Sequence, residues 1–253
     1  MSHRRIELMS SDPSPFLTAK WRHLAMLNYE IDPKVLQPLV PAGTELDDWR
    51  GQTFASVVGF LFLDTRVLGI PIPYHRNFEE VNLRFYVRRK ADEGWRRAVV
   101  FVKEIVPRVA IAWVARALYG ENYVAHPMRN TIGVENDTGP GPRTVSYSWW
   151  VRGAENRMEI TVAGDFEAVA EGSAEAFITE HYWGYARRRG GGTTEYRVEH
   201  PRWRVLEARA ARLDCDIADL YGDQFVEFLQ SPVSAFLADG SEITVFKGAV
   251  LPP

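Results

Sequence analysis

The order of apolar and polar residues along the chain predicts a protein built mainly of β-strands. Residues 52–63 form a near-continuous run of apolar, β-branched and aromatic residues, typical of a strand buried on both faces. Residues 80–87 alternate strictly between polar and apolar, which is the period of a strand. Further strand-like runs, separated by turn-forming residues at hairpin spacing, occupy residues 95–106, 123–135, 143–151, 156–164, 193–199, 203–213 and 243–247. Many antiparallel strands with few helices imply two packed sheets or a closed barrel.

Three short stretches have helical character. Asp32 can cap a helix that begins at Pro33, residues 108–119 are rich in alanine and are followed by Gly120, and residues 217–229 form the third stretch. No repeat and no low-complexity linker divides the sequence. Because β-proteins of about 250 residues commonly form one core, we expect a single domain over residues 1–253, with its core at about 15–248.

The alternating segment at residues 80–87 carries the clearest candidate for a binding site. Glu80, Asn82, Arg84 and Tyr86 share one face of this strand, and the opposite face is wholly apolar. Polar side chains about 7 Å apart along one strand face can line a cavity and hold a small polar ligand. The alternative is a solvated face, because one side of an antiparallel sheet is commonly exposed to water.

Composition and charge exclude several classes of function. The net charge of −3 supplies no field that would attract nucleic acid or an anionic membrane, and no window of 18 apolar residues predicts a membrane span. The first 15 residues lack the apolar run of a secretory signal, and Cys215 is the only cysteine, so we expect a cytoplasmic protein without an intrachain disulfide.

The sequence also lacks the motifs of the common cofactor and metal sites. The six histidines are too widely spaced for an HxH or HExxH site, so we expect no metal. No P-loop, GxSxG elbow or GxGxxG followed by a helix occurs, and we therefore expect no nucleotide cofactor. A small-molecule ligand remains the expected partner, and the oligomeric state is left open.

Several segments together resemble the YqjF-like family of uncharacterised proteins, in the acetoacetate decarboxylase-like superfamily. The specific part is the string Phe-x-Glu-x-Asn-x-Arg-x-Tyr-Val at residues 78–87. Supporting segments are Trp21-Arg-His-Leu-Ala-Met-Leu-Asn-Tyr, Ala115-Arg-Ala-Leu-Tyr-Gly, Phe177-Ile-Thr-Glu-His-Tyr-Trp-Gly-Tyr and Pro232-Val-Ser-Ala-Phe-Leu-Ala-Asp-Gly-Ser. The resemblance implies a mainly β fold with a few short helices, a closed or nearly closed antiparallel β-barrel that holds small carboxylate or keto ligands in its interior.

The resemblance also bears on chemistry. In the decarboxylases a Gly-x-Pro-Lys-Lys stretch carries the lysine that forms the Schiff base, and here Gly120-Glu-Asn-Tyr-Val stands in its place, with Tyr123 for that lysine. A phenol cannot form an imine, so the resemblance implies that Schiff-base decarboxylation is lost. Lys103 is a poor substitute, because strand alternation places it on the opposite face from Glu104, which could otherwise tune it.

Two functional hypotheses follow from these observations. In the first, Glu80, Asn82, Arg84, Tyr86, Tyr123 and Arg116 line a pocket for a small carboxylate or keto compound, with Arg84 paired to the anion and to Glu80 when the site is empty. In the second, the protein is a non-catalytic binding or scaffold protein that uses its tryptophan-rich surface or the arginines at 187–189.

Overall fold

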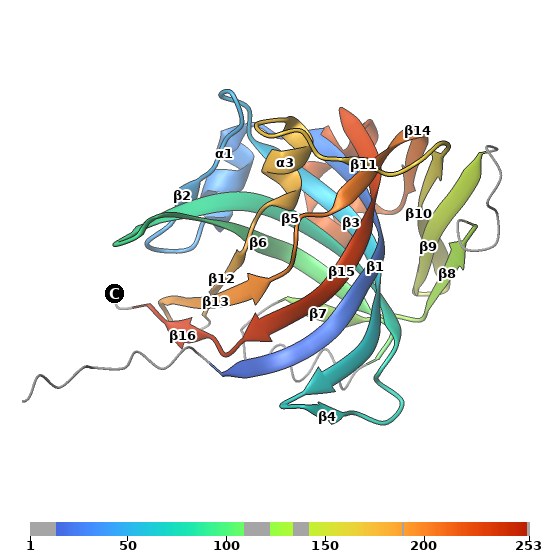
Figure 1. Cartoon of the computed structure of the whole chain (residues 1–253). Coiled ribbons are helices and arrows are strands. Elements are labelled where there is room, and N and C mark those ends of the chain that lie inside the picture. Colours follow the sequence, from blue (N-terminus) through green and yellow to red (C-terminus); the bar gives the residue numbers. More distant parts are fainter. Residues whose placement is uncertain (1–13, 109–121, 134–141, 189, 252–253) are drawn as a thin grey trace, which may run out of the picture.

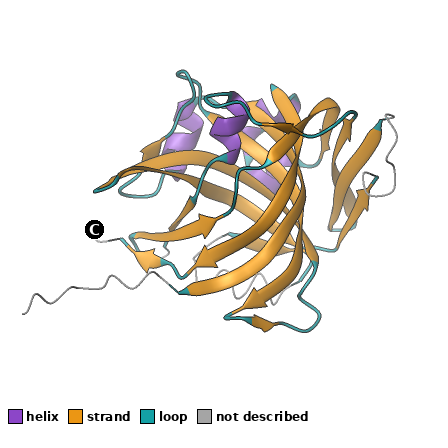
Figure 2. Ribbon diagram, in the orientation of Figure 1, coloured by secondary structure: helices purple, strands orange, loops and turns teal. Residues whose placement is uncertain are grey.

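The computed structural model describes residues 14–108, 122–133, 142–188 and 190–251, and β-strands dominate it (Figures 1 and 2). The long strands are β1 (Pro15–Glu30), β3 (Phe54–Val67), β5 (Phe78–Ala91), β6 (Gly94–Val106), β9 (Arg143–Val151), β10 (Ala154–Val162), β14 (Arg204–Asp214) and β15 (Ser234–Phe246). The shorter ones are β2 (Glu45–Leu46), β4 (Ile70–Pro71), β7 (Tyr123–Ala125), β8 (Met128–Ile132), β11 (Glu167–Ala168), β12 (Trp183–Arg187), β13 (Thr193–Glu199) and β16 (Ala249–Val250).

Short helices gather at one end of the strands (Figure 2). They are α1 (Pro33–Leu36), α3 (Ala174–Thr179) and α4 (Ile217–Tyr221), with 3-10 turns at Gln37–Leu39, Asp223–Phe225 and Phe228–Gln230. Asp32 caps α1 by accepting a hydrogen bond from the Lys34 amide at 2.8 Å, which confirms the predicted capped start. In the part of the chain that the structure describes, no helix is long and apolar enough to cross a membrane.

The strands form a nearly closed barrel. The ring runs in the order β13, β12, β6, β5, β3, β1 and β15, and β15 pairs back onto β13. Two seams of the ring are short: β12 pairs with β6 in parallel over two residue pairs, and β13 pairs with β15 over two. Strands β14, β10, β9 and β8 continue from β15 as an extension that lies beside the barrel (Figure 1). The expected mainly β, nearly closed architecture is therefore confirmed.

Both faces of the central strands are buried, against two different cores. One core lies between the ring and the extension, where the outer faces of β1, β3 and β5 pack on β9 and β10. The packing is tight: a Cβ added to Gly59 of β3 would lie 2.5 Å from the Tyr147 ring. The second core lies inside the ring and includes Leu24, Met26 and Phe60. The ring interior is thus largely apolar, and any polar group inside it requires a partner.

The structure departs from the predicted elements at several places, and α3 and β12 were not predicted at all. Strand β1 was not predicted, because its alternation is broken by a register shift between Arg22 and Ala25, where His23 has a φ of 54°. Strand β15 begins at residue 234 rather than 243, and the stretch 123–135 contains two strands, β7 and β8. The predicted helix at 217–229 is broken after α4 by Gly222, with a φ of 105°, while the predicted helix at 108–119 lies almost wholly outside the described residues.

Candidate functional site

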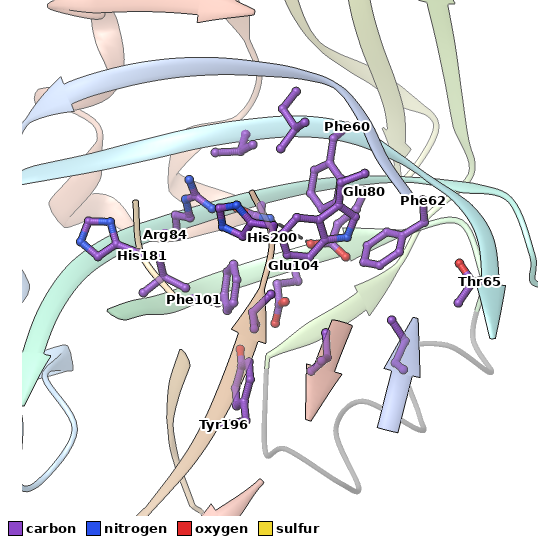
Figure 3. A pocket seen from close by; sticks show the side chains of 18 of the residues that line it. Phe60, Phe62, Thr65, Glu80, Arg84, Phe101, Glu104, His181, Tyr196 and His200 are labelled. Atoms are coloured by element: carbon purple, nitrogen blue, oxygen red, sulfur yellow. Dashed lines mark hydrogen bonds between the residues drawn. The ribbon is translucent and has the colours of Figure 1, made fainter. Parts of the chain in front are cut away.

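A cavity of about 310 Å³ lies inside the ring of strands (Figure 3). Its wall comes mainly from β1, β3, β5 and β6, with side chains from β7, α3, β12, β13 and β15. Most of the wall is apolar or aromatic, and the polar or ionisable members are Thr65, His75, Glu80, Asn82, Arg84, Glu104, Tyr123, Thr179, His181, Tyr196 and His200. This volume falls at the lower end of the range for small-molecule pockets, roughly 300 to 1,000 Å³.

The polar ladder of β5 enters this cavity. Glu80, Asn82 and Arg84 all line it, and only 2%, 1% and 8% of their respective surfaces are exposed. The prediction of a shared interior face is confirmed, and the solvated face is wrong for these three residues. The reason is that β5 is covered on both sides, by the barrel interior and by the outer core.

One other predicted pocket residue, Tyr86, does not appear in the described wall. Tyr86 lies on the same strand face, but its hydroxyl is 2.6 Å from that of Ser56 and its ring lies 4.6 Å from the His181 ring. It is therefore buried beside the cavity rather than lining it, which corrects the prediction. Arg116 lies outside the described residues.

An acidic cluster surrounds Glu80, at the start of the ladder. Asn82 donates to Glu80 Oε1 at 2.9 Å, and the Tyr123 hydroxyl donates to Glu80 Oε2 at 3.3 Å. Burial raises the pKa of Glu80 to about 7, against the opposing hydrogen bonds and the charge of Arg84. Burial and the carboxyl groups of Glu104 and Glu80 hold the pKa of Tyr123 well above its usual range. Tyr123, predicted from the family pattern, thus bridges two carboxyl groups inside the cavity.

Glu104 was not predicted as a site residue, and a β-bulge explains why. Phe101 of β6 is paired with Arg84, but Lys103 is paired with Leu83, so one residue is extra between them. The extra residue reverses the inward and outward order, and Glu104 becomes the cross-strand neighbour of Asn82. Simple alternation from Phe101 would have turned Lys103 inward and Glu104 outward. The sequence contains no turn residue or glycine that marks this bulge.

Arg84 lies at one end of the cavity and has no close counter-ion among the described residues. Its Nη2 donates to the Ile178 carbonyl at 3.4 Å and lies 3.9 Å from the Met26 sulfur, while its Nε is buried without a hydrogen-bond partner. The expected ion pair between Arg84 and Glu80 does not form in the described structure. Instead, the two oxygens of the Glu80 carboxyl group accept hydrogen bonds from Asn82 and Tyr123. Arg84 therefore presents to the cavity a guanidinium that forms no ion pair within the described part of the chain.

His181 lies at the same end of the cavity as Arg84 (Figure 3) and is next to Asp47. Its Nε2 is 3.7 Å from Asp47 Oδ2, a carboxylate that accepts a hydrogen bond from Arg97 Nε at 2.8 Å. Burial lowers the pKa of His181 to about 4, so that its ring is neutral at neutral pH. The sequence offered no signal for His181, which is remote from the ladder along the chain.

Aromatic side chains form the rest of the cavity wall, a group that we call the aromatic wall: Trp21, Phe60, Phe62, Trp203 and His200, of which His200 lies on the Arg84 side of Glu80 (Figure 3). The Trp21 ring is 5.4 Å from Phe60, 5.8 Å from Phe62 and 6.1 Å from Trp203, all edge to face. His200 stacks on Trp203 at 4.2 Å. Trp203 Nε1 donates to Ser241, but Trp21 Nε1 is buried and finds no hydrogen-bond partner within the described ranges. These rings come from β1, β3 and the segment around residue 200, so no local pattern predicted the wall.

None of the five lysines lines the cavity, and all five lie in the described part of the chain. Lys103 is paired with Leu83, on the outer face of β5, and burial lowers its pKa. Among the described residues, no group of three or more His, Cys, Asp or Glu side chains could hold a metal ion. What the cavity does hold is one arginine, a carboxyl group poised to titrate near neutral pH, a bridging phenol and an aromatic surface.

Comparisons with known proteins relate the whole fold to acetoacetate decarboxylase-like enzymes. The enduracididine biosynthesis enzyme MppR, in its complex with pyruvate, superposes with a TM-score of 0.69 at 14% identity, over 97% of this chain and 93% of that one. An acetoacetate decarboxylase-like enzyme from Sphingomonas wittichii RW1 gives a TM-score of 0.65 at 15% identity, over 94% of each chain. Acetoacetate decarboxylase from Legionella pneumophila gives a TM-score of 0.63 at 14% identity, over 100% of this chain and 93% of that one. At such low identity the likeness shows the fold alone.

Sequence comparison identifies the family. Protein YqjF of Bacillus subtilis (strain 168) is 36% identical over 75 residues, which are 29% of this chain and 31% of that protein, so the match spans about a third of this curated relative. The model of the DUF2071 family, described as an uncharacterized conserved protein (COG2071), matches residues 18–242. Because that match covers most of the chain and agrees with the YqjF-like motifs, the chain belongs to the DUF2071 family.

Proposed function

We propose that this protein binds a small carboxylate or keto acid in the barrel cavity, with Arg84 as the residue that holds the carboxylate. The observation that carries this proposal is the state of Arg84: it is 8% exposed, lines the cavity and has a buried Nε with no hydrogen-bond partner in the part of the chain that the structure describes. A buried, unpaired guanidinium costs several kcal/mol, and a bound anion removes that cost. Hydrogen bonds to a charged group contribute about 1.5 to 3 kcal/mol each.

The neighbouring groups fit a ligand that also has a carbonyl or hydroxyl oxygen. Asn82 Oδ1 is buried without a hydrogen-bond partner, and Glu80 changes its protonation near pH 7, so it can accept or donate a proton close to the bound anion. The solved complex of MppR with pyruvate supports the same ligand class by analogy of fold.

Calorimetric titration of pyruvate and acetoacetate, with acetone as the uncharged comparison, tests the proposal. Replacing Arg84 by Met keeps an unbranched, flexible stem and removes the charge. We expect Arg84→Met to bind the two acids roughly ten- to a hundredfold more weakly than the unmodified protein. The matched control is Arg209→Met on the exposed face of β14, which should bind normally. Undiminished binding by Arg84→Met would overturn the assignment.

The proposed site does not act through a Schiff base. Tyr123 occupies the position that the family pattern gives to the lysine, and no lysine lines the cavity. Borohydride reduction in the presence of acetoacetate, followed by mass spectrometry, should therefore leave the protein unmodified. A stable adduct on any lysine would contradict this part of the proposal.

A further inference from the structure

The two ends of the cavity differ in chemistry, and the strand register fixes their order. Along β5 and β3 the cross-strand pairs run from Phe78 with Phe62, through Glu80 with Phe60, to Arg84 with Ser56. At about 3.3 Å per residue, Glu80 and its aromatic partner Phe60 lie roughly 13 Å from Arg84 along the strand, a span that the long arginine side chain and a short aryl acid can share. Figure 3 shows Arg84 and His181 on one side of Glu80, and Phe62 on the other. A molecule as small as pyruvate can occupy only one end.

The aromatic end is built like a binding surface for a ring. Trp21 is cross-strand partner of Phe62, and Phe62 stacks on Phe78 at 4.7 Å with an angle of 14° between the rings. The Trp21 indole N–H is buried and has no hydrogen-bond partner among the described residues, although an aromatic face or an oxygen acceptor beside it would satisfy it. An alkyl chain would fill the space beside Trp21 but would supply neither an aromatic face nor an oxygen acceptor.

The cavity also continues towards the surface at this end. Ile72 and His75, both in the segment between β3 and β5, line it, and 37% of Ile72 is exposed. Leu68, Ile70 and Tyr74 in the same segment are among the most exposed large apolar residues of the described chain. Apolar residues at the rim favour the passage of an apolar group.

We infer that the ligand is an aryl-substituted carboxylic acid, whose carboxylate is held by Arg84 and whose ring lies on the aromatic wall. This inference rests on the proposed function and adds the substrate class. The acid cluster of Glu80, Glu104 and Tyr123 then faces the linker between ring and carboxylate. The wall therefore selects the ligand, and the arginine orients it.

The test is a calorimetric titration at neutral pH with acetate, phenylacetate, 3-phenylpropanoate, 4-phenylbutanoate and 3-cyclohexylpropanoate. We expect the best of the phenyl acids to bind at least roughly tenfold more tightly than acetate, because a ring is removed from water. The cyclohexyl acid has the same number of carbon atoms as 3-phenylpropanoate but no aromatic face. It should bind roughly two- to tenfold more weakly than that acid, which is the contribution of aromatic contacts.

Variants of the wall localise the effect. Trp21→Leu should reduce the preference for phenyl over cyclohexyl acids to about one. Trp95→Leu is the matched control, since 51% of Trp95 is exposed on β6. If Trp21→Leu does not fold, Phe62→Leu serves the same purpose on the neighbouring strand.

The outcomes separate the two proposals. Tight acetate and pyruvate binding without any gain for phenyl acids would refute the aryl class and leave the carboxylate site standing. A gain for phenyl acids that survives both Trp21→Leu and Phe62→Leu would also refute it, because the ring would then lie elsewhere. Failure of every acid to bind would overturn the proposed function and the inference with it.

Discussion

Replacing Glu80 by Gln should stabilise the protein in a way that depends on pH. The carboxyl group is 2% exposed, and burial raises its pKa from 4.5 to about 7. The folded protein then holds this proton more tightly than the unfolded chain, so stability falls as the pH rises from about 4.5 to about 7 and is constant above that. At about 1.4 kcal/mol per pKa unit, the loss is roughly 3 kcal/mol.

Glutamine keeps the shape of the side chain and removes its ionisation. Its Oε1 can still accept from Asn82 Nδ2, and its Nε2 can donate to the Tyr123 hydroxyl oxygen. The Glu80→Gln protein should therefore match the unmodified protein within about 1 kcal/mol near pH 4.5 and exceed its free energy of unfolding by up to roughly 3 kcal/mol near pH 8.

Urea unfolding at several pH values between 4.5 and 8, monitored by tryptophan fluorescence, measures this difference. Glu207→Gln, at an exposed position of β14, is the control and should show no such trend. A stability difference that does not change with pH, or that favours the unmodified protein increasingly as the pH rises, would refute the assignment of a titrating carboxyl group to the cavity.

Three further changes test the packing and charge around the site. Gly184→Ala should cost about 1 to 3 kcal/mol, because its new Cβ would lie 2.1 Å from the Tyr196 ring, and Tyr196→Leu in the same chain should restore part of the loss in thermal melts. Asp47→Asn should cost about 1 to 3 kcal/mol at pH 7 by weakening the bond from Arg97. Burial alone would raise the pKa of Asp47, but His181 and Arg97 lower it from its usual value of 3.8. The cost of Asp47→Asn should therefore vanish as the pH falls below about 3.8, and a cost that does not change with pH would contradict this reasoning. Arg84→Met should keep or raise the melting temperature, since it removes a buried charge with no described counter-ion, and a large fall would show that Arg84 is structurally paired.

The sequence by itself determined the parts of the site that depend on local geometry. Successive side chains of a strand point to opposite faces, so the strict alternation of residues 80–87 was enough to place Glu80, Asn82 and Arg84 together. Turn-forming residues likewise fixed the hairpin between β5 and β6, whose pairing extends to Ala91 with Gly94. The family motifs added the barrel and the position of Tyr123.

Whether the polar face was wet or enclosed could not be read from that strand. The answer depends on β1, β6 and β15, which close the barrel around it, and on β9 and β10, which cover the other face. Tyr86 shows what strand alternation cannot predict. It lies on the same face of β5 as the ladder, but its hydroxyl forms a hydrogen bond with Ser56 of the neighbouring strand. Pairing between strands far apart in sequence leaves no local signature.

Only the tertiary structure decided which residues complete the cavity. One extra residue in β6 turned Glu104 inward and Lys103 outward, and such a bulge is set by its partner strand rather than by its own sequence. His181, His200 and the Trp21 ring reach the site from distant segments because the chain closes into a ring. Side-chain direction along a strand is a local property, whereas enclosure and convergence arise from long-range pairing, and that difference divides what the sequence determined from what the fold decided.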